Sequence, residues 1–171
     1  PDQHYVVLYT SGSTGLPKGV VLEQHSIVNF CYWYSREVGL RTDDRVMAYA
    51  NFGFDCHMLD LFPALITGSC VYVISSDMRL DLPLLNNYME DQGITVAFMT
   101  TQVGHLFATT IENHSLRVLT VAGEKLMPMT APSSYTLYNG YGPTECTVFT
   151  SYYRLEGNYQ RPLIGRPLPN Y

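Results

Sequence analysis

A loop near the start of the chain concentrates residue types that bind phosphate. It places four hydroxyl side chains, three glycines and one lysine in Thr10-Ser11-Gly12-Ser13-Thr14-Gly15-Leu16-Pro17-Lys18-Gly19. Glycines let backbone N–H groups approach an anion, hydroxyls donate further hydrogen bonds, and Lys18 supplies positive charge. The pattern differs from a Walker loop because glycine, instead of serine or threonine, follows the lysine. Composition alone favours a phosphate cradle and a flexible Ser/Gly hairpin about equally.

A second loop combines a turn with an aromatic ring, a hydroxyl and a carboxylate. Its residues are Asn139-Gly140-Tyr141-Gly142-Pro143-Thr144-Glu145. Tyr141 could stack on a nucleotide base, and Thr144 could hydrogen bond to a phosphate oxygen. Glu145 could hold Mg²⁺, which takes a few carboxylates together with nucleotide oxygens. Asn-Gly and Gly-Pro are also ordinary turn dipeptides, so a simple turn is the alternative.

Strand-like apolar runs alternate with helix-like segments, which predicts an α/β fold with a largely parallel sheet flanked by helices. We expect strands at 5–9, 19–22, 45–50, 70–74 (buried), 94–99, 117–121, 135–138 and 148–152. Apolar residues at helical spacing predict helices near 27–38, 58–65, 82–89 and 103–109. Gly68 and Gly93 are expected to end the second and third of these. Because ligands bind beyond the carboxyl ends of such strands, the loops that follow them should hold the site.

Bulk composition restricts the class of protein. Of 171 residues, 46% are hydrophobic and 15% charged, which suits a folded core and argues against disorder. The net charge is −5 without any run of Lys or Arg, so no nucleic-acid partner is expected. No apolar stretch reaches about 18 residues, so no membrane span is expected. The four cysteines lack zinc-ligand spacing, and we expect free thiols in a cytoplasmic protein.

Together, the two loops resemble the adenylate-forming superfamily, which includes acyl-CoA synthetases, luciferases and the adenylation domains of nonribosomal peptide synthetases. The stretches YTSGSTGLPKG (Tyr9–Gly19) and NGYGPTE (Asn139–Glu145) stand in the order found in the family. Three further segments resemble family motifs: Phe54-Asp55, Ala122-Gly123-Glu124 and the stretch IGRPLPN at 164–170. The resemblance covers the chain from about Val6 to its end, and Asp55 favours the peptide synthetase branch.

This resemblance implies both a fold and a reaction. Residues 1–171 would be one flavodoxin-like subdomain from the large N-terminal core of an adenylation domain, without its C-terminal lobe. The carboxylate of an amino acid would attack the α-phosphate of ATP, giving an aminoacyl adenylate and pyrophosphate. The thiol of a phosphopantetheine arm on a peptidyl carrier protein would then take the aminoacyl group. ATP and Mg²⁺ are the implied cofactors. The carrier protein and a condensation domain of the same antibiotic-type assembly line are the implied partners.

The matching motifs also imply roles for individual residues. Catalytic roles fall to Lys18, Thr144 and Glu145, with Glu145 as the Mg²⁺ ligand. Gly123 and Asn139 would border the adenine, and Tyr141 would stack on it. The full set expected to bind ATP or AMP is Thr10, Ser11, Gly12, Ser13, Thr14, Gly15, Lys18, Gly123, Asn139, Tyr141, Gly142 and Thr144.

Asp55 is expected to pair with the α-ammonium group of an amino acid. A fatty or aryl acid offers no cation there, and a lone buried carboxylate is unfavourable. From the sequence, an N-cap of the following helix is the alternative. The resemblance places around the substrate Asp55, Cys56, Leu59, Phe98, Thr120, Ala122, Gly140, Val148 and Phe149. This pocket is expected to be apolar, without a charge opposite Asp55, and to suit Val, Leu or Ile.

Two departures from the family pattern and two other functions remain open. Cys56 and His57 follow Asp55, where a small residue and serine are usual. Residues 125–138 form a short segment for the family, which puts in doubt a helix usually found there. An acyl- or aryl-CoA synthetase is the alternative enzyme. A nucleotide-binding module without turnover is the alternative outside catalysis.

Overall fold

The framework of the structure is a seven-stranded sheet. The computed structural model describes residues 3–11 and 15–170. The strands lie in the order β11-β9-β8-β6-β5-β3-β4. Their bounds are β3 (Arg45–Ala48), β4 (Cys70–Val73), β5 (Val96–Thr100), β6 (Val118–Ala122), β8 (Thr136–Tyr141), β9 (Ser151–Leu155) and β11 (Arg166–Pro167). From β4 to β8 all neighbours are parallel, whereas β9 and β11 are antiparallel to their neighbours.

The five parallel strands have a flavodoxin-like order. Counted along the chain, the spatial series β4-β3-β5-β6-β8 reads second, first, third, fourth, fifth. The order reverses between β3 and β5, and in such sheets the ligand crevice forms at this point, beyond the carboxyl ends. The expected α/β class with a largely parallel sheet is therefore confirmed, and the topology indicates where to look for a site.

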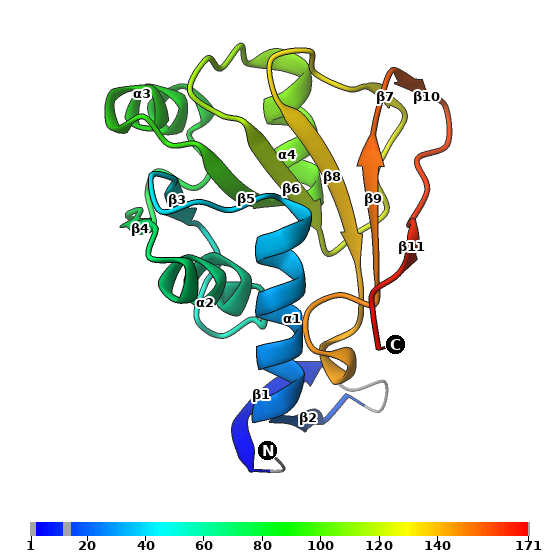
Figure 1. Cartoon of the computed structure of the whole chain (residues 1–171). Coiled ribbons are helices and arrows are strands. Elements are labelled where there is room, and N and C mark those ends of the chain that lie inside the picture. The colour runs from blue at the N-terminus through cyan, green and yellow to red at the C-terminus, as the bar shows by residue number, and fades with distance from the viewer. Residues whose placement is uncertain (1–2, 12–14, 171) are drawn as a thin grey trace.

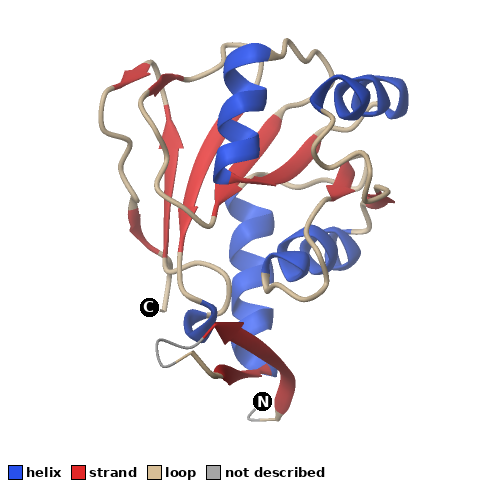
Figure 2. Ribbon diagram, turned by 180° about the vertical axis from the view of Figure 1, so that it is seen from behind, coloured by secondary structure: helices blue, strands red, loops and turns tan. Residues whose placement is uncertain are grey.

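Four helices cover the sheet: α1 (Gln24–Glu37), α2 (Cys56–Thr67), α3 (Leu82–Gln92) and α4 (Thr101–Thr110). Figure 1 shows α1 in front of the sheet, and Figure 2, from behind, shows α4 in front of the opposite face. The predicted glycine caps are confirmed, because Gly68 and Gly93 end α2 and α3 with left-handed φ of 81° and 62°. Asp81 caps the start of α3 by accepting a hydrogen bond of 3.0 Å from the Leu84 amide.

A separate hairpin brings the two loops of the sequence analysis together. It consists of β1 (His4–Ser11) and β2 (Pro17–Glu23), paired antiparallel, and lies at the end of α1 (Figure 1). β2 contacts the short 3₁₀ helix η1 (Thr144–Cys146). The described end of the first loop, at the start of β2, is thus a neighbour of the second loop at η1.

The segment between β6 and β8 contains no helix, as its short length suggested. Residues 123–135 instead form turns and β7 (Met129–Thr130), which pairs with β10 (Asn158–Tyr159). One strand expectation was wrong: β4 is an edge strand, and Val73 is 64% exposed. A buried strand and an edge strand of similar apolar composition cannot be distinguished without the sheet order.

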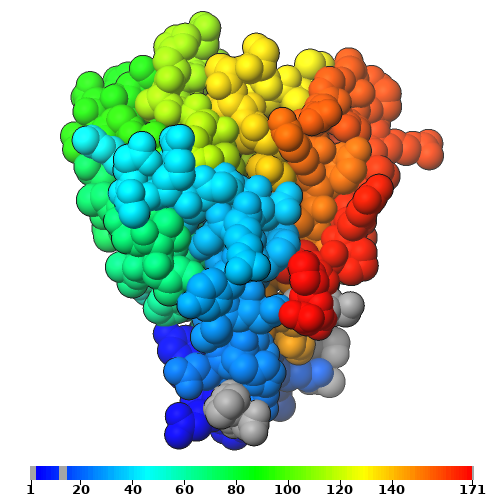
Figure 3. All heavy atoms as spheres, viewed as in Figure 1, coloured from blue at the N-terminus to red at the C-terminus, as the bar shows by residue number. Residues whose placement is uncertain are grey.

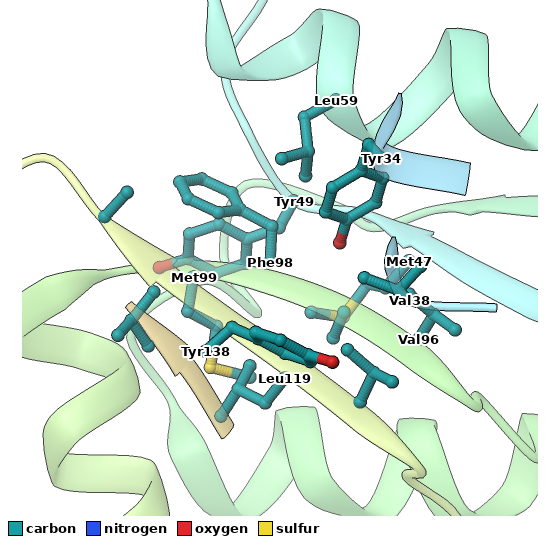
Figure 4. Close-up of a cluster of buried hydrophobic side chains, with 14 of the residues drawn as sticks. Tyr34, Val38, Met47, Tyr49, Leu59, Val96, Phe98, Met99, Leu119 and Tyr138 are labelled. Carbon is teal, nitrogen blue, oxygen red and sulfur yellow. The ribbon is translucent and has the colours of Figure 1, made fainter. Parts of the chain in front are cut away.

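The core lies on both faces of β5 and β6. Figure 4 shows Tyr34 and Leu59 from the helices on the same side of the sheet as Phe98, whereas Met99, the next residue of β5, points to the opposite face. All four are at most 3% exposed. No disulfide bond joins any of the four cysteines within the described residues. Within the described part of the chain, no helix has the length and apolar character needed to cross a bilayer.

Candidate active site

A cavity of about 620 Å³ opens beyond the carboxyl ends of the parallel strands. Its walls come from the ends of β3, β5 and β6, from the loop after β4, from the start of α2 and from the turn after β8. It therefore lies at the point where the strand order reverses, as the flavodoxin-like topology requires. The volume is typical of a site for a small molecule or nucleotide.

The structure brings most of the expected substrate residues to this cavity. The lining includes Asp55, Cys56, Phe98, Ala122, Val148 and Phe149, together with Gly123, Gly142 and Thr144 of the expected nucleotide set. These residues come from four separate parts of the chain. Their roles toward a substrate remain predictions.

Asp55 stands in the N-cap position of α2, but its side chain makes no capping hydrogen bond. It is 9% exposed and belongs to the cavity wall. Burial raises the pKa of this carboxyl above its ordinary value, while hydrogen bonds from Thr144 and Cys56 act in the opposite direction. The capping alternative therefore does not account for this carboxylate, which is available to a ligand in the cavity.

Three expected substrate residues do not line the cavity: Leu59, Thr120 and Gly140. Leu59 is 3% exposed and packs in the core between α2 and the sheet. Thr120 is fully buried, and its hydroxyl hydrogen bonds to Tyr34 Oη at 3.1 Å and Tyr152 Oη at 2.7 Å. These two rings, from α1 and β9, thus hold the Thr120 hydroxyl within the core.

Gly140 acts on the cavity wall through Phe149 and does not itself line the cavity. A Cβ atom at Gly140 would lie 2.6 Å from the Phe149 ring, so the ring lies flat against this glycine. Phe30 and Tyr152 contact the same ring, each with centroids 5.7 Å away. Phe149 is thus in contact with Gly140, Phe30 and Tyr152, and it also lines the cavity.

A strained turn positions the apolar wall. Thr147 and Val148 have φ of 60° and 71°, a region that β-branched residues rarely adopt. Such conformations cost about 1–3 kcal/mol each and are often found at functional sites. This turn leads from η1 into the two wall residues Val148 and Phe149. It also explains why the last predicted strand, expected from Val148, begins only at Ser151.

The expected adenine residues have different environments. Tyr141 is 52% exposed, so its ring is available for stacking. Asn139 is 4% exposed, and its Nδ2 donates to the Leu163 carbonyl at 2.9 Å. Asn139 therefore fixes the segment after β10, and it is not part of the cavity wall. Gly142 allows close backbone contact, because a Cβ there would lie 2.6 Å from Phe149 Cα.

The expected phosphate residues lie on the hairpin beside η1. Thr10 pairs with Lys18 across the hairpin, and Ser11 and Lys18 are exposed. Gly15 has a left-handed φ of 82°. Gly12, Ser13 and Thr14, also expected to bind phosphate, lie outside the described residues. Because β2 contacts η1, Lys18 and Thr144 are carried on adjacent elements.

Glu145 fits the expected magnesium ligand. It is an exposed carboxylate on η1, next to the hairpin. In the described part of the chain, no group of three or more His, Cys, Asp or Glu side chains could hold a metal ion by itself. Mg²⁺ at nucleotide sites usually takes one or two carboxylates and completes its shell with phosphate oxygens and water. A single carboxylate beside the hairpin expected to bind phosphate is compatible with that requirement.

Sequence reasoning missed two charged residues in the wall. Arg79, from the loop after β4, and Glu124, after β6, both line the cavity together with Asp55. The expectation that the pocket holds no charge opposite Asp55 was therefore wrong. Glu124 belongs to the Ala122-Gly123-Glu124 stretch that resembles a family motif, so the sequence could have indicated it as a residue of the pocket. Nothing in the sequence around Arg79 indicates it, because the loop joining β4 and α3 has no periodic pattern.

Comparison with known proteins identifies the family. The family model of AMP-binding enzymes matches residues 1–171, and the chain belongs to this family. Surfactin synthase subunits 1 and 2 of Bacillus subtilis (strain 168) are each 41% identical over 164 residues, 96% of this chain and 4% of the relative. Bacitracin synthase 1 of Bacillus licheniformis is 40% identical over 96% of this chain and 3% of its own. The chain thus spans a small fraction of these peptide synthetases.

Solved structures show the same fold. The Vibrio cholerae adenylation domain AlmE, solved with glycyl-adenosine-5'-phosphate, matches with a TM-score of 0.82 and 26% identity. That match covers 97% of this chain and 33% of AlmE. The N-terminal subdomain of Klebsiella oxytoca NpsA matches with a TM-score of 0.79 over 98% of this chain and 45% of its own. At 23% identity, the NpsA match supports the fold alone.

Proposed function

We propose that this chain is the substrate-binding part of a peptide synthetase adenylation domain that activates an amino acid with ATP. The observation that carries the proposal is the buried carboxylate of Asp55, which lines the same cavity as Thr144 of the second loop. A buried carboxylate favours a cationic partner, and the α-ammonium of an amino acid supplies one. Asp55 would thus hold the substrate beside the residue expected to contact the α-phosphate.

The chain's own residues would mainly position and neutralise charge, which phosphoryl chemistry of this kind requires. Lys18 and the hydroxyls of the hairpin turn would bind the triphosphate. Thr144 would donate to the α-phosphate, and Tyr141 would stack on adenine. Mg²⁺ held by Glu145 would neutralise charge on the phosphate oxygens.

We propose an aliphatic amino acid as the substrate. Phe98, Ala122, Val148 and Phe149 form an apolar wall, to which Asp55 contributes a carboxylate. One methylene in such a pocket changes binding by only about 1–3 kcal/mol, so some activation of each of Val, Leu and Ile is expected.

We also propose that the aminoacyl group is transferred to a phosphopantetheine thiol on a carrier protein. A condensation domain of the same synthetase is the other proposed partner. The multidomain relatives support it.

The test is amino-acid-dependent ATP–pyrophosphate exchange by the complete synthetase that contains this chain. The panel holds Val, Leu and Ile, charged amino acids, and fatty and aromatic acids. Exchange with the aliphatic amino acids supports the proposal. Exchange with fatty or aryl acids alone would indicate a CoA synthetase, and binding of Mg-ATP without any exchange would indicate a module without turnover.

A further inference from the structure

Two buried polar atoms, on Asp60 and Arg79, belong to side chains that line a second, small cavity. Asp60 of α2 is 1% exposed and fully enclosed between the helix and β3. Its Oδ2 accepts hydrogen bonds from the amides of Tyr49 and Ala50, at 2.8 and 2.7 Å. Its Oδ1 and the Nε of Arg79 are buried, and neither has a hydrogen-bond partner among the described residues. Unsatisfied buried polar atoms of this kind are rare and require an explanation.

A second, small cavity of about 20 Å³ is lined by both Asp60 and Arg79. About 10–15 Å³ is enough to hold one water molecule, provided that polar groups surround it. Asp60 and Arg79 form no direct ion pair within the described part of the chain. Burial raises the pKa of Asp60 to about 8, and the amides of Ala50 and Tyr49 and the charge of Arg79 act against this. The two side chains therefore interact without touching.

In the described lining of the small cavity and the substrate cavity, two residues belong to both: Ala50 and Arg79. Its backbone is fixed as well, because Tyr49 Oη donates to the Arg79 carbonyl at 3.1 Å. Tyr49 is in turn held at its amide by Asp60, and its ring packs edge-on against Phe98 of the cavity wall, 6.4 Å between centroids. Asp60, Tyr49 and Arg79 thus form one connected support for the wall.

We propose that one ordered water molecule in the small cavity accepts a hydrogen bond from Arg79 Nε and forms a second hydrogen bond with Asp60 Oδ1. We further propose that this bridge fixes the Arg79 guanidinium in the wall of the amino-acid cavity, where it discriminates against positively charged side chains. Arg79 is then a specificity-determining residue and Asp60 its positioning residue. Like charges brought together at a binding site are strongly unfavourable, which makes such a barrier effective.

The first experiment measures pyrophosphate exchange by variants of the complete synthetase, so it rests on the proposed function. Arg79→Met keeps most of the apolar stem of the side chain and removes its charge. Exchange with lysine or ornithine, relative to leucine, should rise by about tenfold or more. Arg79→Lys, the matched control, keeps the charge and should leave this ratio within a fewfold of the wild type. Asp60→Asn should loosen Arg79 and raise exchange with lysine relative to leucine by less than Arg79→Met does, while kcat for leucine changes little. An unchanged ratio in Arg79→Met would overturn the specificity role.

The second experiment is a crystal structure, which does not depend on turnover. A crystal structure of the adenylation core should show one water within hydrogen-bond distance of both Asp60 and Arg79. A direct Asp60–Arg79 ion pair, or no water between them, would overturn the bridge. If the wild-type enzyme exchanges no amino acid, the proposed function fails, whereas the crystal structure still decides the bridge.

Discussion

Replacing Asp55 with alanine in the complete synthetase tests the residue on which substrate choice rests. The variant would leave the α-ammonium of the substrate buried without its partner. Removing one member of a buried charge pair costs about 3–5 kcal/mol, so kcat/KM should fall roughly a hundred- to a thousandfold or more. Asp91→Ala, at an exposed position late in α3, is the control and should behave as wild type. A loss smaller than about tenfold would show that Asp55 does not bind the ammonium.

Gly140→Ala tests a residue that acts through its neighbour. The new methyl group would lie 2.6–2.8 Å from ring atoms of Phe149, which Phe30 and Tyr152 also contact. The ring should therefore move into the cavity. We expect exchange with Leu and Ile to fall about tenfold or more relative to exchange with alanine. Adding Phe149→Leu should restore the larger substrates. If the single variant keeps its wild-type preference, the ring does not limit the pocket.

At the scale of elements, a buried ion pair joins the start of the sheet to α1. Arg117, just before β6, donates from Nε to Asp44 Oδ1 at 2.7 Å and from Nη1 to the Val38 carbonyl at 2.7 Å. Asp44 also accepts from Thr95 Oγ1 at 2.7 Å. Burial alone would raise the pKa of Asp44, but hydrogen bonds from Arg117 and Thr95 outweigh it and hold that pKa below its ordinary value.

Arg117→Ala should therefore destabilise the ends of β3 and β6 far from the site. Leaving Asp44 buried and unpaired costs about 3–5 kcal/mol. Hydrogen–deuterium exchange of β3 and β6 in the complete synthetase would measure the lost protection. In the wild type, the contribution of Asp44 is present above its unfolded pKa of about 3.9 and is lost as pH falls through the lower folded pKa. Equal protection in variant and wild type at neutral pH would contradict this role.

At the scale of the whole molecule, apolar surface gathers on the hairpin, α1 and α2. Figure 3 shows α1 at the surface of this face, with the C-terminal segment beside it. Asn170 Nδ2 donates to Asn29 Oδ1 of α1 at 2.8 Å, which holds that segment there. Tyr5, Tyr32 and Ile66 are 45%, 57% and 49% exposed and line a groove of about 240 Å³. Exposed patches of this kind commonly mark surfaces that contact other parts of a protein.

Residues 1–171 expressed alone should fold as an α/β unit, bind ATP weakly at best and make no detectable adenylate. The family resemblance implies an aspartate for the ribose and a lysine from a C-terminal lobe, and neither lies in this sequence. Each missing preorganised charge typically lowers the rate a hundredfold or more. Circular dichroism and pyrophosphate exchange would measure both parts of the prediction. Amino-acid-dependent exchange by these residues alone would show that the additional lobe is dispensable.

The sequence by itself determined the layers and the loops that matter. Helical spacing from Ile27 to Val38 and glycines at 68 and 93 predicted α1 and the ends of α2 and α3, because periodicity and capping are local properties. The second motif identified the loop after β8, at the carboxyl end of a parallel strand, whereas the first lies on the separate hairpin. Local patterns also placed Asp55 at the start of α2, next to the site.

Only the tertiary structure decided which of these side chains reach the cavity. Thr120 and Ala122 lie on the same face of β6, two residues apart, yet only Ala122 lines the cavity. Tyr34 and Tyr152, distant in sequence, hold the Thr120 hydroxyl within the core through hydrogen bonds. Arg79 lines the cavity from a loop without a periodic sequence pattern. β4 is an edge strand because it comes last in the spatial order of the sheet. These outcomes depend on long-range packing, which local sequence patterns do not encode.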